Sequence, residues 1–161
     1  MSDVKKVIIM RSPSGGGKST MARKIVEDAA QNSLSAIIHS TDDLFIKNGI
    51  YNFNPELIGP NHNRNFKNFQ KSLDAGINVI IIDNTNIKRF EYRKYEKEAI
   101  EKGYSLEYSQ FGKDFGFGEN NEIISDDELV SRVSNRAKND LSAATPPEEV
   151  IRRMYRDYKV I

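Results

Sequence analysis

Short, nearly continuous apolar runs recur along the first two thirds of the chain. They lie at residues 4–10, 36–39 and 77–82, and a fourth run follows at 104–108. Apolar runs of this length suit strands that are covered on both faces of a parallel sheet. We therefore predict four strands, of which 77–82 is the most continuous.

The stretches between and after these runs place apolar residues three or four positions apart, which is typical of helices with one buried face. Strands that alternate with such helices predict a three-layer α/β domain with a mostly parallel sheet. A short helix is also expected after the second strand, because Ser40, Thr41, Asp42 and Asp43 supply capping oxygens. The predicted helices are 19–30, 43–47, 55–75, 89–102, 126–137 and 147–158.

The composition favours one intracellular domain that spans residues 1–161. The chain is 38% hydrophobic, and its 24 basic and 23 acidic residues give a net charge of +1, so no global field indicates a nucleic-acid or membrane partner. It has no cysteine and two histidines, which excludes disulfides and thiolate metal sites and leaves Mg²⁺ as the natural metal. The first apolar run is too short for a signal peptide or a membrane span, so we expect a cytoplasmic protein.

The stretch RSPSGGGKST follows the first strand and nearly matches the phosphate-binding pattern G-x-x-x-x-G-K-[ST]. Its glycines let backbone N–H groups approach phosphate, Lys18 can reach the β- and γ-phosphates of ATP, and the Ser19 hydroxyl can ligate Mg²⁺. Ser12 replaces the first glycine of the pattern, and because it precedes Pro13 we expect an altered loop entry. The residues predicted to bind ATP here are Ser14, Gly15, Gly16, Gly17, Lys18, Ser19 and Thr20.

Two acidic residues follow the second strand. Because the carboxyl ends of parallel strands meet at one edge of the sheet, Asp42 is expected beside the γ-phosphate, where it can accept a proton from an attacking hydroxyl. Its neighbour Asp43 is expected to contact substrate. The competing interpretation is that Asp42 only caps a helix.

The third strand ends in Asp83, which we expect to orient Mg²⁺ or its waters, although an aspartate can also simply end a strand. The polar residues Asn84, Thr85 and Asn86 follow it. They suit substrate contacts, or they form only a turn.

The stretches RSPSGGGKST, STDDLF, GIYNFNPELIGPNH, IIIDNTN and SRVSNRAKNDLSAATPPEEVIRRMYRDY together resemble a family of small P-loop kinases. This zeta-toxin-related family includes the kinase domain of phage polynucleotide kinase and NEDD4-binding-protein-2-like domains. The resemblance spans nearly the whole chain and implies ATP-dependent phosphorylation of a hydroxyl, typically the 5′-OH of DNA or RNA. It implies that Lys18 and Ser19 hold ATP and Mg²⁺, that Asp42 is the base, and that Arg136, with help from Arg132, acts from a helical lid at about 111–145.

The chain departs from this family at several positions. Phe45 stands where the polynucleotide kinase has an arginine that holds a substrate phosphate, and Lys47 can replace that arginine only as a point charge. Residues 111–121 insert Phe111, Phe115 and Phe117 among glycines, either to stack an exposed base or to pack the lid onto the core.

These departures leave the acceptor open. The favoured acceptor is a nucleic-acid hydroxyl. The alternatives are a hydroxymethylated base such as 5-hydroxymethyluracil in phage DNA, a nucleoside or other small molecule, and a nucleotide-binding module without transfer activity.

Three further residues near these motifs have open roles. Arg11 precedes the phosphate loop and contacts either substrate or solvent. His62 lies near the expected acceptor cleft and is interpreted as a hydrogen-bonding residue. Ile151, Met154 and Tyr158 share helical spacing and are expected to dock the last helix on the core.

Overall fold

The central sheet has four parallel strands, β1 (Lys6–Arg11), β2 (Ala36–His39), β5 (Val79–Ile82) and β6 (Ser105–Gln110). Their order is β2-β5-β1-β6, and the register pairs Ile8 with Ile81 and with Glu107. These coordinates come from a computed structural model that describes residues 3–159. The predicted parallel sheet is therefore confirmed.

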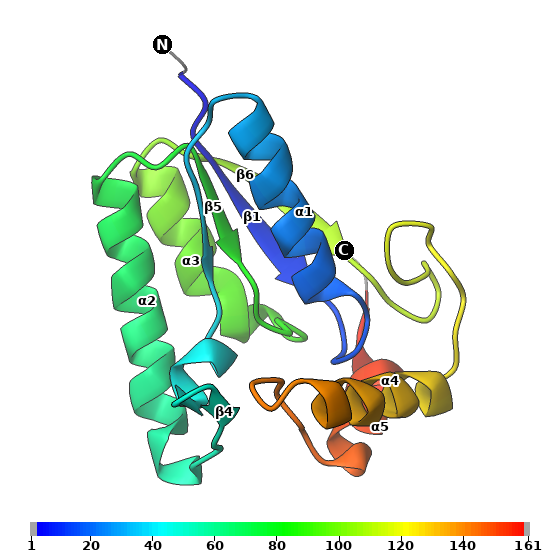
Figure 1. Cartoon of the computed structure of the whole chain (residues 1–161). Helices are drawn as coiled ribbons and strands as arrows, with labels where there is room; N and C mark the ends of the chain where they lie inside the picture. The colour runs from blue at the N-terminus through cyan, green and yellow to red at the C-terminus, as the bar shows by residue number, and fades with distance from the viewer. Residues whose placement is uncertain (1–2, 160–161) are drawn as a thin grey trace.

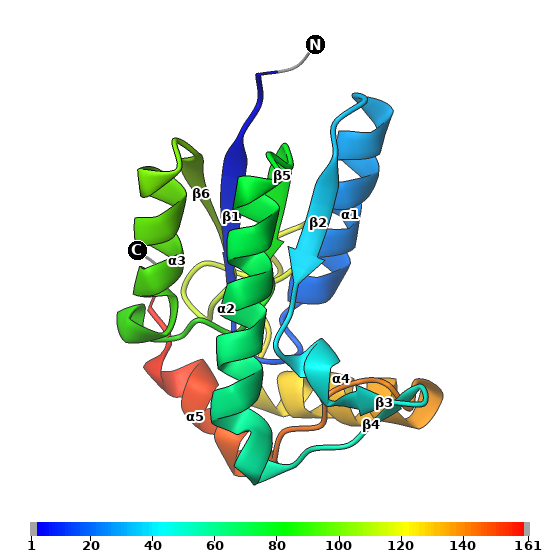
Figure 2. The ribbon, with the colours of Figure 1, turned by 90° about the vertical axis from the view of Figure 1, so that its left-hand side faces the viewer.

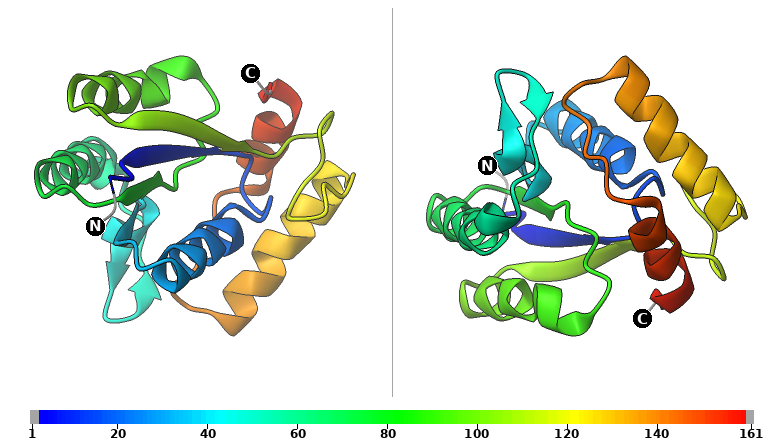
Figure 3. Two further views of the ribbon diagram at one scale, coloured as in Figure 1. Left: turned by 90° about the horizontal axis from the view of Figure 1, so that it is seen from above. Right: turned by 90° about the horizontal axis from the view of Figure 1, so that it is seen from below.

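Helices cover both faces of the sheet (Figures 1 and 3). The helices α2 (Ile58–Asp74) and α3 (Arg89–Glu101) lie on one face, and α1 (Lys18–Gln31) lies on the other. Figure 2 shows α4 (Asp126–Asn139) and α5 (Glu148–Asp157) below the carboxyl ends of the strands. The predicted three-layer α/β architecture is confirmed. Within residues 3–159, no helix combines the length and the apolar character needed to cross a membrane.

The alternation of side chains along the strands divides the core into two layers. Val7 and Ile9 of β1 pack with Phe69 of α2 and Tyr95 of α3, whereas Ile8 and its neighbours face α1. All four residues of β5 are buried. A fully buried isoleucine contributes roughly 1.5–3 kcal/mol, so β5 holds the two helical layers together.

The short helix that we expected over 43–47 is present in part, as a 3₁₀ helix at Asp42–Phe45. Its last two expected residues instead belong to a hairpin of two short antiparallel strands, β3 (Ile46–Lys47) and β4 (Ile50–Tyr51). Asn48 and Gly49 join these strands with positive φ angles of 52° and 79°. Asn-Gly is the residue pair that favours a two-residue hairpin turn, so the chain leaves the helix at Phe45 and forms the hairpin.

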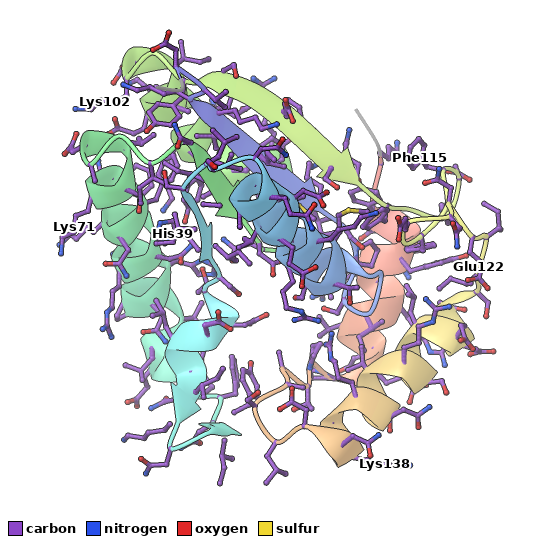
Figure 4. The ribbon with its side chains drawn as sticks, turned by 45° about the horizontal axis from the view of Figure 1, so that its top comes forward. His39, Lys71, Lys102, Phe115, Glu122 and Lys138 are labelled. Atoms are coloured by element: carbon purple, nitrogen blue, oxygen red, sulfur yellow. The ribbon has the colours of Figure 1, made fainter. Side chains whose placement is uncertain are left out.

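The lid has a small core of its own. Phe111 and Phe117 are buried against Leu129 of α4 and Ile151 of α5, and the Phe117 ring stacks on Tyr155 with 6.1 Å between centroids. This confirms the packing interpretation for Phe111 and Phe117. Phe115 is half exposed and points away from the body of the protein in Figure 4.

The docking of the last helix is confirmed, because Ile151 and Tyr158 are buried and Met154 packs against the lid core. Tyr158 packs against Arg11 at the carboxyl end of β1. Its hydroxyl donates a hydrogen bond to the carbonyl of Arg11 over 3.2 Å. The last helix is thereby joined to the strand that leads into the phosphate loop.

Arg11 is neither a surface residue nor exposed to a substrate, and both expectations for it are wrong. Its side chain is 2% exposed, and its guanidinium lies between the rings of Tyr92 and Tyr158, 4.9 Å and 5.0 Å from their centroids. It donates hydrogen bonds to the carbonyls of Asn86 and Ile87, each over 2.8 Å. Further bonds reach the Lys159 carbonyl and the Gln110 side chain. Arg11 therefore ties together the ends of β1, β5 and β6 and the end of the chain.

Replacement of Arg11 by methionine is expected to lower the free energy of unfolding by about 3 kcal/mol, because several buried acceptors lose their donor. Urea unfolding followed by circular dichroism measures this loss. Arg93→Met, at an exposed position of α3, is the control and should change stability by about 0.5 kcal/mol or less. A loss below about 1 kcal/mol for Arg11→Met would contradict the role described for this side chain.

Candidate active site

The phosphate loop connects β1 to α1 with two glycines in left-handed backbone conformation. The φ angles are +83° at Gly15 and +96° at Gly17, the residue that precedes α1. Only glycine adopts such angles without strain. The N–H groups of the first helical turn have no intrahelical partners, and together with the helix dipole they form an anion-binding site. The local geometry is that of a phosphate cradle.

Ser12 takes the place of the missing glycine without strain. It is fully buried and its φ is not positive. Its N–H donates to the Thr85 carbonyl over 3.1 Å, and its hydroxyl donates to the Pro13 carbonyl over 2.8 Å. A side chain on Gly16 would approach the Ser12 oxygen to 2.0 Å. Ser12 therefore fills the loop entry, and Gly16 must stay small.

The lid rests directly on the phosphate loop. A Cβ on Gly15 would lie 3.0 Å from the Leu129 carbonyl oxygen and 3.1 Å from a Val133 methyl group, both on α4. The N–H of Gly118, in the glycine-rich insertion, donates to the Gly16 carbonyl over 3.2 Å. The glycines therefore admit the lid as well as phosphate.

Asp83 lies beside the start of α1 because β5 pairs with β1. Its Oδ2 accepts a hydrogen bond from the Ser19 hydroxyl over 3.0 Å, and its Oδ1 lies 3.6 Å from the Lys18 Nζ. Asp83 is buried, and Oδ1 has no hydrogen-bond partner among the described residues. Lys18 and Asp83 are separated by 65 positions in the sequence, and the parallel pairing of β1 with β5 brings them together.

Ser19 and Asp83 fit a magnesium site of the kind that depends on nucleotide phosphates. Mg²⁺ prefers hard oxygen ligands and usually takes only one or two from protein. A hydroxyl beside a buried carboxylate with an unsatisfied oxygen meets this requirement. In residues 3–159 no cluster of three or more His, Asp or Glu side chains could hold a metal by itself. The remaining ligands would therefore come from phosphate and water.

Asp42 follows β2 at the same edge of the sheet, and it is exposed to solvent where it lines a cavity. Loss of solvation raises the pKa of its carboxyl, while the positive charge of Lys18 opposes this shift and Asp83 adds to it. The pKa of Asp43 is raised as well, first by desolvation and then by the charges of Asp83 and Asp42. A carboxylate with a raised pKa is a better proton acceptor than an ordinary aspartate.

The cavity beside Asp42 has a volume of about 560 Å³ and is bounded by the hairpin, α2, the loop after β5 and α5. The Tyr51 N–H on β4 donates to the Leu141 carbonyl over 2.7 Å, so the lid and the hairpin meet above it. The lining residues are Ser14, Thr41, Asp42, Phe45, Tyr51, Phe53, Ile58, His62, Asn84, Thr85, Asn86, Glu91, Ala144, Thr145, Pro146, Pro147, Val150 and Met154.

The loop after β5 lines this cavity, but two of its side chains also hold the backbone. Asn84 Oδ1 accepts a hydrogen bond from the Thr41 N–H over 2.9 Å, and Asn86 Nδ2 donates to the Met10 carbonyl over 2.8 Å. Asn86 is 1% exposed with a φ of +49°, an angle that asparagine tolerates. Substrate contacts by Asn84, Thr85 and Asn86 stay a prediction. Since the side chains of Asn84 and Asn86 are hydrogen-bonded to backbone groups, the side chain of Thr85 is the least constrained of the three.

The lid arginines differ in their surroundings. Arg136 on α4 is exposed, and its positive charge acts to lower the pKa of Asp42, so it lies within electrostatic reach of the site. Arg132, one turn earlier, forms ion pairs with Glu128 at 3.1 Å and Glu122 at 3.6 Å. The structure therefore favours Arg136 over Arg132 for contact with phosphate.

The sequence interpretation missed most of the apolar wall of the cavity. Tyr51 lies on β4 and Phe53 just after it, in a segment for which we expected only a loop, and Ile58 comes from the start of α2. The Asn48-Gly49 turn was the signal that could have indicated their position. His62 was noted near the acceptor cleft; it lines the cavity, and its Nδ1 is hydrogen-bonded to the Thr41 hydroxyl over 3.2 Å. His39, by contrast, is buried between β2 and α2 and hydrogen-bonded to Ser72 (Figure 4).

The chain resembles known proteins chiefly in fold. Human NEDD4-binding protein 2 is 37% identical over 89 residues, which cover 55% of this chain and 5% of that protein. No protein-family model matches the chain.

Two solved structures superpose over nearly the whole chain. A chain of the Pnkp1/Rnl/Hen1 RNA repair complex gives a TM-score of 0.67 at 17% identity, covering 98% of this chain and 45% of that one. A gluconokinase from Sinorhizobium meliloti gives 0.57 at 15% identity, covering 99% and 78%. At these identities the likeness concerns the fold, which is that of the P-loop kinases.

The raised pKa of Asp42 has a consequence for stability. A carboxyl whose pKa is higher in the folded protein stabilises the fold at acidic pH, and this contribution is lost as the pH rises through the folded-state pKa. Asp42→Asn, which carries no charge, is therefore expected to raise the melting temperature at pH 7 and to have less effect at pH 4.

Asp140→Asn provides a control of opposite sign for this experiment. Hydrogen bonds from Ser142 lower the pKa of Asp140, so its charged form favours the folded state above the unfolded pKa. Its replacement should therefore lower the melting temperature slightly at pH 7. If Asp42→Asn also lowered it, the carboxylate would not be the destabilising group described here.

Proposed function

We propose that the protein is an ATP-dependent kinase that transfers the γ-phosphate to a hydroxyl of a nucleic acid, most simply a 5′-OH end. The observation that carries this proposal is the juxtaposition of a phosphate cradle, the Ser19–Asp83 pair and the Asp42 carboxylate at one edge of the sheet. The superposition on a chain of an RNA repair complex supports a nucleic-acid acceptor. The resemblance to NEDD4-binding protein 2 covers just over half of this chain.

In the proposed reaction the acceptor hydroxyl lies in the cavity beside Asp42. The hydroxyl oxygen forms a bond to the γ-phosphorus while the bond from that phosphorus to the β,γ-bridging oxygen breaks, and ADP leaves. The hydroxyl proton moves to the Asp42 carboxylate, whose raised pKa suits it to accept this proton. Asp42 is therefore assigned as the general base.

Positive groups would stabilise the phosphate charge that develops during transfer. Lys18 lies at the start of α1 with its side chain 11% exposed, so its ammonium is held in place rather than mobile. Arg136 lies on α4, and its charge acts on Asp42, so it would supply a second positive group. Mg²⁺, bound through Ser19 and Asp83, would neutralise negative charge on the phosphates.

A kinase for a nucleoside, a hydroxymethylated base or another small alcohol is the second candidate. The cavity favours it because no Lys or Arg belongs to its lining among residues 3–159. The superposition on a gluconokinase indicates that this fold also occurs in a kinase of a small polyol acid. A nucleotide-binding module without transfer activity is the least supported alternative, since Ser12 fits the loop without strain.

Two substitutions separate catalysis from nucleotide binding. Asp42→Asn should lower kcat by about 10²- to 10⁴-fold, because the general base is lost, and should change ATP affinity little. Lys18→Ala should weaken both, because the charge on the phosphates is lost. Transfer from labelled ATP and calorimetric ATP titration measure the two effects. Asp140→Asn is the control, and it should leave kcat and ATP affinity unchanged. Near-normal turnover of Asp42→Asn would refute the assignment of the base.

The acceptor class can be identified with labelled ATP and three sets of acceptors. These are 5′-OH oligonucleotides of DNA and RNA, DNA that contains 5-hydroxymethyluracil, and free nucleosides. We expect label on oligonucleotide ends, removable by a phosphatase specific for terminal phosphate. Label that resists this treatment in the modified DNA would instead identify a base kinase, and label only on small molecules would exclude the nucleic-acid acceptor.

A further inference from the structure

We infer that the group entering the cavity beside Asp42 is a nucleoside whose base stacks on the aromatic cluster of Phe45, Tyr51 and Phe53, and that a phosphate on its 3′ side contributes no binding. This inference rests on the proposed function, since it concerns the acceptor of the same site. It is independent of whether the nucleoside is free or ends a polynucleotide.

The charges around the cavity carry the first part of the inference. Its ionisable lining residues are Asp42, Glu91, His62 and Tyr51, and within the described chain no Lys or Arg joins them. Burial lowers the pKa of His62, which favours the neutral imidazole, and burial together with the Asp42 charge raises the pKa of Tyr51 to about 12. The lining therefore has a negative balance at neutral pH and would repel a phosphate group.

The Lys and Arg side chains that influence Asp42 and His62 do not belong to the cavity lining. Lys18 pairs with Asp83 beneath the phosphate cradle, and Arg136 belongs to the lid helix. Lys94 lies 4.9 Å from the centroid of the Phe66 ring, on the α2–α3 side. Each of these charges influences Asp42 or His62 from outside the cavity wall. A phosphate next to the acceptor hydroxyl would thus meet acidic and apolar groups first.

The aromatic wall carries the second part. The Phe53 ring lies 5.3 Å from the Phe45 ring between centroids, with an interplanar angle of 36°, and Tyr51 lies 6.1 Å from Phe45. Phe45 is buried, whereas Phe53 is 51% exposed and forms the outer part of the wall. A planar base can stack on an exposed ring of this kind without regard to its sequence. Val150 and Met154 of α5 supply an apolar wall on the lid side.

The size and the neighbours of the cavity agree with a nucleoside. A volume of about 560 Å³ falls within the range of roughly 300–1,000 Å³ that holds a small organic ligand. Asp42 lines the same cavity as the aromatic cluster and is close enough to Tyr51 for its charge to raise the pKa of that phenol, so a base stacked on the cluster would leave the sugar near the carboxylate. His62 is fixed through Nδ1 by Thr41, which leaves Nε2 for the ligand.

The test compares each of the four deoxynucleosides with its 3′-monophosphate, using the full chain. Binding is measured by calorimetry with a non-hydrolysable ATP analogue and Mg²⁺ present, and transfer is measured with labelled ATP. We expect the two forms to bind within about threefold of each other. A tenfold or greater gain from the 3′-phosphate, or nucleosides that fail to bind, would overturn the inference.

Two phenylalanines of equal exposure provide matched variants. Phe53→Ala should weaken nucleoside binding by about 5- to 150-fold, the range expected for loss of one base–aromatic stack. Phe115→Ala, at a residue of 50% exposure on the glycine-rich insertion, should leave it unchanged. Weaker binding only in Phe115→Ala would mean that the insertion, and not the cavity, holds the base.

Phe53→Arg provides a gain of function, because it adds a cation at the rim of the cavity without burying it. It should create a preference of tenfold or more for the 3′-monophosphates, and Phe115→Arg should not. Failure of Phe53→Arg to shift the preference would contradict the electrostatic argument. Nucleoside binding without transfer to any acceptor would contradict the proposed kinase activity and support the inferred nucleoside site. Transfer that requires the 3′-phosphate would support the kinase activity and contradict the inferred site.

Discussion

The parallel pairing of β1 with β5 is the constraint on which the site depends. It aligns Ile9 with Ile82 at the carboxyl ends of the two strands, so the next residues of each chain segment emerge side by side. Lys18, Ser19 and Asp83 then meet within hydrogen-bond or ion-pair distance. A slip of one residue would turn the buried side chains of β5 to the opposite layers and move Asp83 away from α1. The contacts of Asp83 with Lys18 and Ser19 and the packing of the core therefore require the same register between β1 and β5.

Arg11 extends this constraint to the lid. It joins the end of β1 to the loop after β5 and to Lys159, while Tyr158 covers its guanidinium from one side. The loop after β5 and α5 are two of the walls of the cavity, so their relative position is set by a residue that does not line it. Gly15 contributes in another way, because the lid helix α4 packs where a side chain would be. The phosphate loop would thus be shared by the proposed nucleotide site and the packing of α4.

Sequence patterns predicted the parts of this structure that depend on neighbouring residues. Short, nearly continuous apolar runs indicated the strands, and the glycines with Lys18 indicated the cradle. Asp42 and Asp83 were placed at one edge by the general geometry of parallel sheets. Arg11 could not be interpreted in this way, since its partners lie 75 to 148 residues away in sequence. The hairpin is a different case, because its signal is local: Asn48-Gly49 favours a two-residue turn directly after the 3₁₀ helix.

The acidic character of the cavity fits the role proposed for Asp42. Its carboxylate already carries a desolvation penalty, with Asp83 adding repulsion and Lys18 opposing it. A phosphate bound in the same cavity would add further negative charge close to Asp42 and Asp43, and it would also repel the γ-phosphate that must approach. An uncharged acceptor avoids both effects, and the base then needs only the charges of Lys18 and Arg136 to remain ionised. No Lys or Arg belongs to the described lining. The charges that lower the pKa of Asp42 therefore include Lys18 and Arg136, which would face the phosphates of ATP, and no Lys or Arg of the cavity wall.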